Sequence, residues 1–120
     1  ESDLERAADM ILEWEFARTP APEVLSAAKD QILNNGQEAL SRDFNTCNVF
    51  NVIGELVKIT SPTLVLCGSE DRLTPVKYAE FLHEKMSNAK LEIIPNSGHN
   101  VMIEEPEAVN NAIRVFATAL

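Results

Sequence analysis

Apolar residues recur at helical spacing in the first part of the chain. Leu4, Ala8 and Ile11 lie three or four positions apart, which places them on one face of a helix. Ser2 and Glu5 stand three residues apart just before this pattern, and that spacing is typical of a capping box at a helix start. The pattern therefore predicts a helix that begins near Ser2.

A second helix is predicted to begin at Pro22, because proline is favoured in the first turn of a helix. Residues 34–36 (Asn-Asn-Gly) are typical of a helix C-cap and should end it. We expect a short third helix over residues 37–42. Asparagines alternate with apolar residues over 43–54, and we expect an irregular connection there with at most a turn of helix.

The pattern changes after Pro62. Residues 63–67 (Thr-Leu-Val-Leu-Cys) are apolar on both faces and end at Gly68, as expected for a parallel strand that is covered on both sides. Thr74 and Pro75 then supply an N-cap and a first-turn proline. The sequence therefore predicts a helix that begins there and ends near residue 88.

Residues 91–94 (Leu-Glu-Ile-Ile) predict a second strand, and Pro106 is expected to open the last helix. A strand-helix-strand order requires a right-handed parallel crossover. The predicted fold class is therefore α/β, with a helical part over 1–58 and a parallel β-α-β-α unit over 59–120. The apolar faces of the two later helices should be buried: Val76, Ala79, Leu82 and Met86 in one, Val109, Ile113, Phe116 and Leu120 in the other.

Composition excludes several classes of function. The 120 residues carry 10 basic and 19 acidic side chains, and a net charge of −9 disfavours binding to nucleic acid or to anionic membranes. No apolar run reaches the roughly 18 residues of a membrane span, and we see no signal peptide. Cys47 and Cys67 lack metal-ligand spacing, so we expect reduced thiols, with Cys67 buried, in a cytoplasmic protein without cofactor or metal.

Two polar residues follow the predicted strands. Asp71 lies in the loop after the first strand and His99 in the loop after the second. The carboxyl ends of parallel strands meet at one edge of a sheet, and adjacent strands are about 4.8 Å apart. Asp71 and His99 can therefore reach each other, and an aspartate that accepts a hydrogen bond from imidazole fixes its tautomer for proton transfer.

Residues 59–117 resemble the C-terminal end of the α/β-hydrolase family. The matching motifs are ITSPTLVLCGSEDRLTP, LEIIPNSGH and EEPEAVN, in the family's order. The resemblance implies that Asp71 is the acid and His99 the general base of a catalytic triad. It also implies that residues 1–58 are a helical cap of the kind that many members insert before these strands.

The family's nucleophile stands on a G-x-S-x-G turn, and this chain has no such motif, because no two of its four glycines are four positions apart. We therefore expect a C-terminal fragment of a serine hydrolase that cleaves an ester or similar acyl bond in a small molecule, inactive by itself. A non-catalytic interaction or dimerisation module is the alternative. A fragment of a C–C hydrolase, dehalogenase or haloperoxidase is a further one, because fold does not fix function.

Other chemistry-bearing residues are better explained structurally. His83 is expected on a solvated helix face, Glu70 in a loop, and Glu104 and Glu105 at a helix start, where their charge suits the helix dipole. Four large apolar residues can line an acyl pocket, but core packing is favoured for each: Trp14, Phe44, Phe50 and Met102.

A first prediction concerns oligomeric state. A parallel strand that is apolar on both faces belongs inside a sheet, and an unpaired strand edge invites pairing with another chain. We expect a homodimer formed by edge-to-edge pairing or by exchange of the helical part about residues 58–62. Light scattering at tens of micromolar should give the dimer mass, and a strict monomer would contradict the prediction.

Overall fold

A computed structural model describes residues 2–120 of the chain. It divides into two compact units. The first unit comprises the chain as far as Glu13 together with Thr19–Val52, and the second comprises Trp14–Arg18 together with Ile53–Leu120. The first unit is helical, and the second contains the sheet.

Helix α1 (Asp3–Glu15) begins with the predicted capping box. The Ser2 backbone N–H donates to Glu5 Oε2 over 2.7 Å, and the Glu5 N–H donates to Ser2 Oγ over 3.2 Å. Two N–H groups that a helix start leaves without partners are thereby satisfied. Ala8 and Leu12 form the buried face of α1.

Helix α2 (Pro22–Val49) contains the predicted break at Gly36, whose φ of +78° lies in the left-handed region that favours glycine. The helix then resumes and continues to Val49. The expected helix over 37–42 is therefore present but longer than predicted, and the irregular connection expected over 43–54 is wrong except at residues 50–52. No proline or glycine interrupts residues 37–53, and asparagine lowers helix propensity by only tenths of a kcal/mol. A 3₁₀ helix, η1 (Ile53–Lys58), follows.

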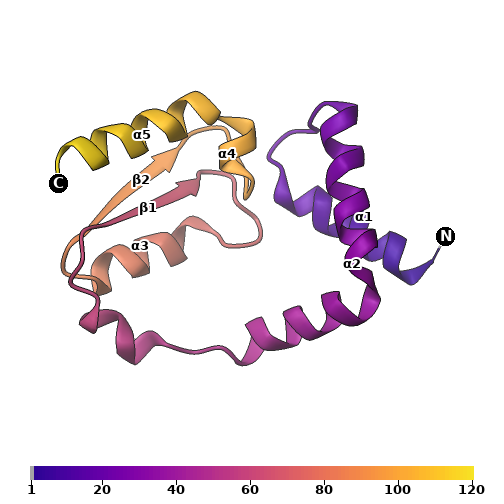
Figure 1. Cartoon of the computed structure of the whole chain (residues 1–120), viewed down its shortest axis with the longest axis horizontal. Coiled ribbons are helices and arrows are strands. Elements are labelled where there is room, and N and C mark those ends of the chain that lie inside the picture. The colour runs from indigo at the N-terminus through magenta and orange to yellow at the C-terminus, as the bar shows by residue number, and fades with distance from the viewer. Residues whose placement is uncertain (1) are drawn as a thin grey trace. The chain divides into compact units, whose positions relative to one another are not determined.

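Strands β1 (Thr63–Gly68) and β2 (Ala89–Ile94) pair in parallel, in register from Thr63 opposite Ala89 to Gly68 opposite Ile94. Both arrows point the same way in Figure 1. The predicted parallel pair is confirmed, although β2 begins two residues earlier than expected because the register continues back to Ala89. Helix α3 (Val76–Lys85) connects the strands.

Helix α3 lies on one side of the two strands and helix α5 (Pro106–Thr118) on the other (Figure 1). Pro106 stands in the first turn of α5, as predicted. Thr74 does not cap α3, however, since the helix begins after Pro75 without a side-chain cap. The Thr74 hydroxyl instead donates to a carboxylate oxygen of Asp71, 2.9 Å away.

The core on the α5 side consists of Ile94, Val101 and Val109, against which Leu66 and Ala108 pack. Val101 belongs to a short helix, α4 (Val101–Glu104), that the sequence pattern did not predict.

The predicted apolar faces of the two later helices are buried only in part. Ala79 and Met86 of α3 are buried as expected. On α5, Val109 is buried, but Ile113 is 48% exposed, and Leu120, which lies beyond the end of the helix at Thr118, is 76% exposed. A sheet of two strands is too narrow to cover the whole apolar stripe of α5, so the outer part of that stripe stays in solvent.

Two glycines allow backbones to meet at the carboxyl end of the sheet. A Cβ atom on Gly68 would overlap the carbonyl oxygens of Ser97 and Gly98, and one on Gly98 would lie 2.6 Å from the backbone nitrogen of Ala17. Real Cβ atoms do not approach so closely. Gly68 and Gly98 are therefore required for close backbone approach.

The close approach at Gly68 predicts a large cost for a single methyl group. Gly68→Ala should lower the free energy of unfolding by about 2 kcal/mol or more, because the neighbouring atoms are backbone and cannot move aside. Gly54→Ala is the matched control, since a Cβ there meets nothing within 4 Å, and it should change stability by less than about 0.5 kcal/mol. Urea unfolding measures both, and equal effects would contradict the prediction.

Candidate active site

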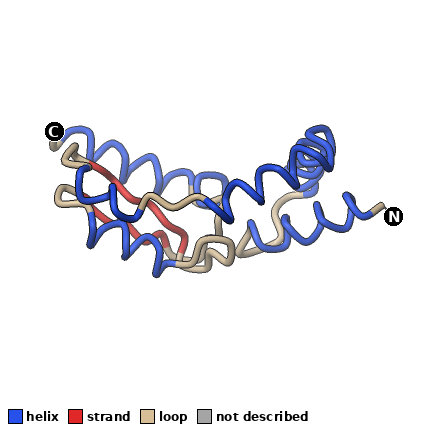
Figure 2. The backbone as a smooth tube through the Cα atoms, turned by 90° about the horizontal axis from the view of Figure 1, so that it is seen from below, coloured by secondary structure: helices blue, strands red, loops and turns tan. Residues whose placement is uncertain are grey.

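The loops that follow β1 and β2 are joined to each other by hydrogen bonds. The Ser69 N–H donates to the Ile94 carbonyl over 2.9 Å, and the Ser69 hydroxyl accepts from the Asn96 N–H over 3.0 Å. The Glu70 N–H donates to the Ser97 carbonyl over 2.9 Å. Figure 2 shows both loops in tan at one end of the red strands. These bonds hold the two loops side by side at the carboxyl end of the sheet.

The structure brings the two predicted site residues together. Asp71 Oδ2 and His99 Nδ1 lie 2.9 Å apart, which is hydrogen-bond distance. The Asp71 side chain is 5% exposed, whereas the His99 side chain is 39% exposed. The carboxylate is therefore shielded from water, while the imidazole is partly accessible to solvent.

Asp71 accepts further hydrogen bonds from its own loop. The backbone N–H groups of Leu73 and Thr74 donate to Oδ1 over 2.9 and 2.8 Å, and the Thr74 hydroxyl donates to Oδ2. Burial by itself raises the pKa of Asp71, but hydrogen bonds from the Thr74 backbone, His99 and the Thr74 hydroxyl outweigh it. The pKa of Asp71 is consequently lowered from its ordinary value of 3.8.

An ionised Asp71 can only accept hydrogen bonds, so His99 must carry its proton on Nδ1 to donate to it. The Thr74 hydroxyl oxygen lies 3.1 Å from the same ring nitrogen. In this tautomer the other ring nitrogen, Nε2, has a free lone pair, and within residues 2–120 we find no hydrogen bond to it. The pair can therefore accept a proton at Nε2 while Asp71 stabilises the resulting imidazolium.

The residues before His99 are structural. Ser97 is fully buried, and its hydroxyl donates to the Ile94 carbonyl over 2.9 Å, so it is not available as a nucleophile. Asn96 has a φ of +57°, a left-handed conformation that asparagine tolerates better than most residues. This turn directs the chain from β2 toward His99.

Two polar residues at the site were not identified from the sequence as site residues. Thr74 was expected to cap a helix and instead contacts Asp71 and His99. Glu104 was expected to act through a helix dipole, but its carboxylate accepts backbone N–H groups from Gly98, Ala17 and Arg18. Backbone N–H groups have no sequence signature, so no pattern could have revealed these partners.

The remaining candidates lie outside the site. His83 is exposed on α3, as expected, and the Glu70 side chain is exposed. Core packing is wrong for all four large apolar candidates, which are 43–68% exposed: Trp14, Phe44, Phe50 and Met102. The described residues offer no cluster that would bury them.

Both cysteines are free, and Cys67 is buried as expected while Cys47 is exposed. Burial raises the pKa of the Cys67 thiol, and the charge of Asp71 adds to this effect. Over residues 2–120, no group of three or more His, Cys, Asp or Glu side chains could hold a metal ion. In the same range, no helix has both the length and the apolar character of a membrane span.

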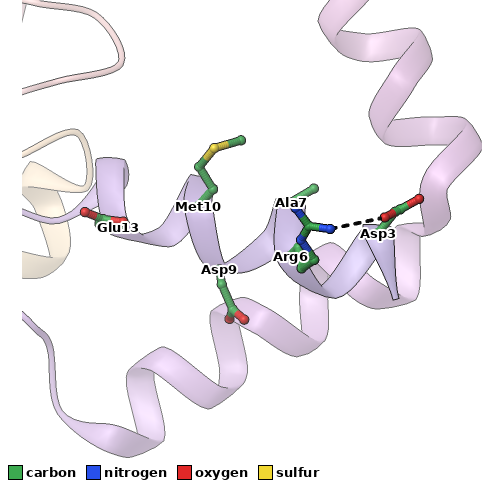
Figure 3. A pocket seen from close by; sticks show the side chains of 6 residues that line it. All are labelled: Asp3, Arg6, Ala7, Asp9, Met10 and Glu13. Carbon is green, nitrogen blue, oxygen red and sulfur yellow. Dashed lines mark ion pairs between the residues drawn. The ribbon is translucent and has the colours of Figure 1, made fainter. Parts of the chain in front are cut away.

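A surface hollow lies along helix α1 and contains none of the predicted site residues (Figure 3). It is lined by Asp3, Arg6, Ala7, Asp9, Met10 and Glu13. Arg6 and Asp3 form an exposed ion pair at 3.8 Å, a kind of contact that contributes little to stability. The lining of this hollow contains no serine, cysteine or histidine.

Comparisons of the sequence with protein families and with curated proteins both find similarity to hydrolases. A family model described as alpha/beta hydrolase fold matches residues 5–106. The chain is 37% identical over 65 residues to the AB hydrolase superfamily protein YisY of Bacillus subtilis, an alignment that covers 54% of this chain and 24% of YisY. It is 35% identical over 81 residues to a proline iminopeptidase of Saccharolobus solfataricus, covering 60% of this chain and 26% of that protein.

Among solved structures, a thermophilic esterase matches with a TM-score of 0.85 and 32% sequence identity. This match covers 98% of the chain and 47% of the esterase. The chain thus spans about a quarter of the curated relatives named above and just under half of the esterase.

The lowered pKa of Asp71 predicts a pH-dependent contribution to stability. A carboxyl group whose pKa is lower in the folded state stabilises the fold above its unfolded pKa, and this contribution is lost as pH falls through the folded value. The difference in free energy of unfolding between the wild type and Asp71→Asn should therefore be largest near neutral pH, about 1–3 kcal/mol. It should shrink below pH 3.8, the ordinary value for Asp71.

Urea unfolding from about pH 7 to about pH 2.5 would measure this difference. Glu70→Gln, which removes the adjacent exposed carboxylate, is the matched control and should show no comparable pH-dependent loss. A stability difference for Asp71→Asn that is the same at every pH would contradict a lowered pKa of Asp71 in the folded state.

Proposed function

We propose, since the chain belongs to the α/β-hydrolase fold family, that Asp71 and His99 are the acid and the general base of a hydrolytic triad. The observation that carries this proposal is their 2.9 Å contact at the carboxyl ends of two adjacent parallel strands. Ligand and catalytic sites of parallel α/β sheets lie at that edge.

In the proposed mechanism, His99 Nε2 takes the proton of a nucleophilic hydroxyl as that oxygen attacks the acyl carbon. The imidazolium then gives this proton to the leaving group when the tetrahedral intermediate collapses. Asp71 keeps the proton of Nδ1 in place and stabilises the positive charge on the ring. The lowered pKa of Asp71 supports this role, because the carboxylate has to stay ionised throughout the cycle.

The nucleophile has to come from outside these 120 residues. A serine on a G-x-S-x-G turn and the backbone N–H groups of an oxyanion hole are the parts that the mechanism still needs. We propose that a longer protein supplies them, with residues 1–58 as its helical cap, and that this chain by itself does not hydrolyse substrates. The proposal agrees with the partial coverage of the relatives, 24% of YisY and 47% of the esterase.

For the substrate we propose an ester or similar acyl bond in a small molecule. The thermophilic esterase, which matches nearly the whole chain at 32% identity, supports this choice. The similarity to a proline iminopeptidase also supports it, because a peptidase cleaves the acyl bond of a peptide. An Asp in place of Ser as nucleophile would instead favour a dehalogenase.

A non-catalytic dimerisation module is the second proposal, and one observation favours it. Within residues 2–120, β1 pairs only with β2, so its other edge has no strand partner. The reading frame upstream of Glu1 separates the two proposals. About 130 further codons that contain a nucleophile turn favour the enzyme, whereas a start codon directly before Glu1 favours the module.

The catalytic role of His99 can be tested in the complete protein. His99→Ala should lower kcat for an ester substrate by several orders of magnitude, about 10⁴–10⁶-fold, because the general base is lost. His83→Ala is the matched control, since that imidazole is exposed on α3, and it should keep full activity. Steady-state kinetics measure both, and an active His99→Ala variant with wild-type turnover would refute the assignment.

A further inference from the structure

The carboxylate of Glu104 joins two segments that are far apart in the sequence. Its Oε2 accepts the N–H of Gly98, the residue directly before His99, over 2.6 Å. Its Oε1 accepts the N–H of Ala17 over 2.8 Å and that of Arg18 over 3.4 Å. One side chain therefore holds the loop that carries His99 against residues 15–18.

The same two segments make further contacts on the other side of His99. The Asn100 N–H donates to the Glu15 carbonyl over 3.0 Å, and the Asn100 side chain donates to Glu15 Oε2 over 3.1 Å. The Arg18 guanidinium donates to the Asn96 carbonyl over 2.8 Å. Both chain neighbours of His99 are thus bonded to residues 15–18 or to the carboxylate that binds them.

The backbone at Gly98 cannot move closer to the backbone of residues 15–17. A Cβ on Gly98 would lie 2.6 Å from the Ala17 nitrogen and 2.9 Å from the Glu15 carbonyl oxygen. The two backbones are therefore already at their closest approach, and the hydrogen bonds of Glu104 oppose their separation. The position of the His99 backbone depends on this connection.

We propose that Glu104 is a positioning residue for His99. Its carboxylate is hydrogen-bonded to the backbone of Gly98, Ala17 and Arg18 and not to the imidazole or to Asp71, so it acts through the backbone of Gly98. This inference rests on the proposed function, in which the imidazole has to meet a nucleophile in a fixed geometry. Displacement of a catalytic group by about 1 Å can cost about 10²-fold in rate.

Helix-dipole stabilisation is the competing explanation for an acidic residue at this point. It requires only a negative charge near the start of α5. An aspartate at position 104 would then be as effective as glutamate, and the neighbouring Glu105 would have the same effect as Glu104. Bridging requires two accepting oxygens and the full length of the glutamate side chain. The two explanations therefore differ in their response to specific substitutions.

Three variants separate these explanations. Glu104→Gln keeps one accepting oxygen but turns an NH₂ group toward a backbone N–H, so one segment is released. Glu104→Asp keeps the charge but is one methylene shorter and cannot reach both segments. Glu105→Gln removes the neighbouring charge, which forms an exposed ion pair with Arg18 at 3.5 Å, a kind of contact that contributes little, and it serves as the matched control.

In the complete protein, Glu104→Gln and Glu104→Asp should each lower kcat by roughly 10²-fold, with KM changed by less than about twofold. Glu105→Gln should match the wild type. If Glu104→Asp matches the wild type, or if Glu105→Gln loses as much kcat as Glu104→Gln, helix-dipole stabilisation explains the residue and the proposal is overturned.

A second readout needs no catalytic activity. In the 120-residue chain, the Nδ1–H proton of His99 should give a downfield NMR signal while it is bonded to Asp71, and both Glu104 variants should broaden or shift it. The amide signals of β1 and α3 should stay in place and report an intact fold. An unchanged His99 signal in both variants would overturn the proposal.

The two readouts also separate this inference from the proposed function. A lost His99 signal in the Glu104 variants, together with an inactive wild-type complete protein, supports the positioning role and refutes the hydrolase proposal. Should Glu104→Gln leave the chain unfolded, Glu104→Asp and Asn100→Ala decide by the same signal, since each retains part of the connection.

Discussion

The parallel register of β1 and β2 is the constraint from which the site follows. Gly68 lies opposite Ile94, so both strands end at the same level and their loops leave the sheet side by side. Hydrogen bonds continue across the loops, and Gly68 leaves room for the backbone of Ser97 and Gly98 to lie against it. A side chain at Gly68 would separate the loops and with them the carboxylate from the imidazole.

The two members of the pair are held in different ways. Asp71 is fixed locally, because the N–H groups that bind it belong to residues two and three positions further along its own loop. His99 is fixed from a distance, because its chain neighbours are bonded to residues 15–18, more than eighty positions away, or to Glu104. The orientation of His99 is therefore a tertiary property, whereas that of Asp71 is largely a property of one turn.

The unit that contains the sheet also carries apolar side chains that it cannot cover. A two-stranded sheet supports α3 on one side and part of α5 on the other, which leaves Ile113 and Leu120 in solvent. Parallel sheets are usually wider and buried on both faces. The partial match to the esterase fits this picture, since the chain corresponds to just under half of that protein.

The sequence by itself determined the elements whose signals are local: the capping box at Ser2 and Glu5, the break at Gly36, the strand that ends at Gly68 and the first-turn proline at Pro106. It also predicted that Asp71 and His99 lie close together, because the loops that follow adjacent parallel strands leave the sheet at the same edge.

Only the tertiary structure decided the partners of Thr74 and Glu104. The sequence assigned both residues to helix starts, since capping and dipole preferences can be recognised within a few positions. Their actual roles depend on a carboxylate in the same loop and on backbone N–H groups from another part of the chain. Every residue other than proline carries such an N–H group, so the choice among them is made by packing at Gly98 and not by residue type.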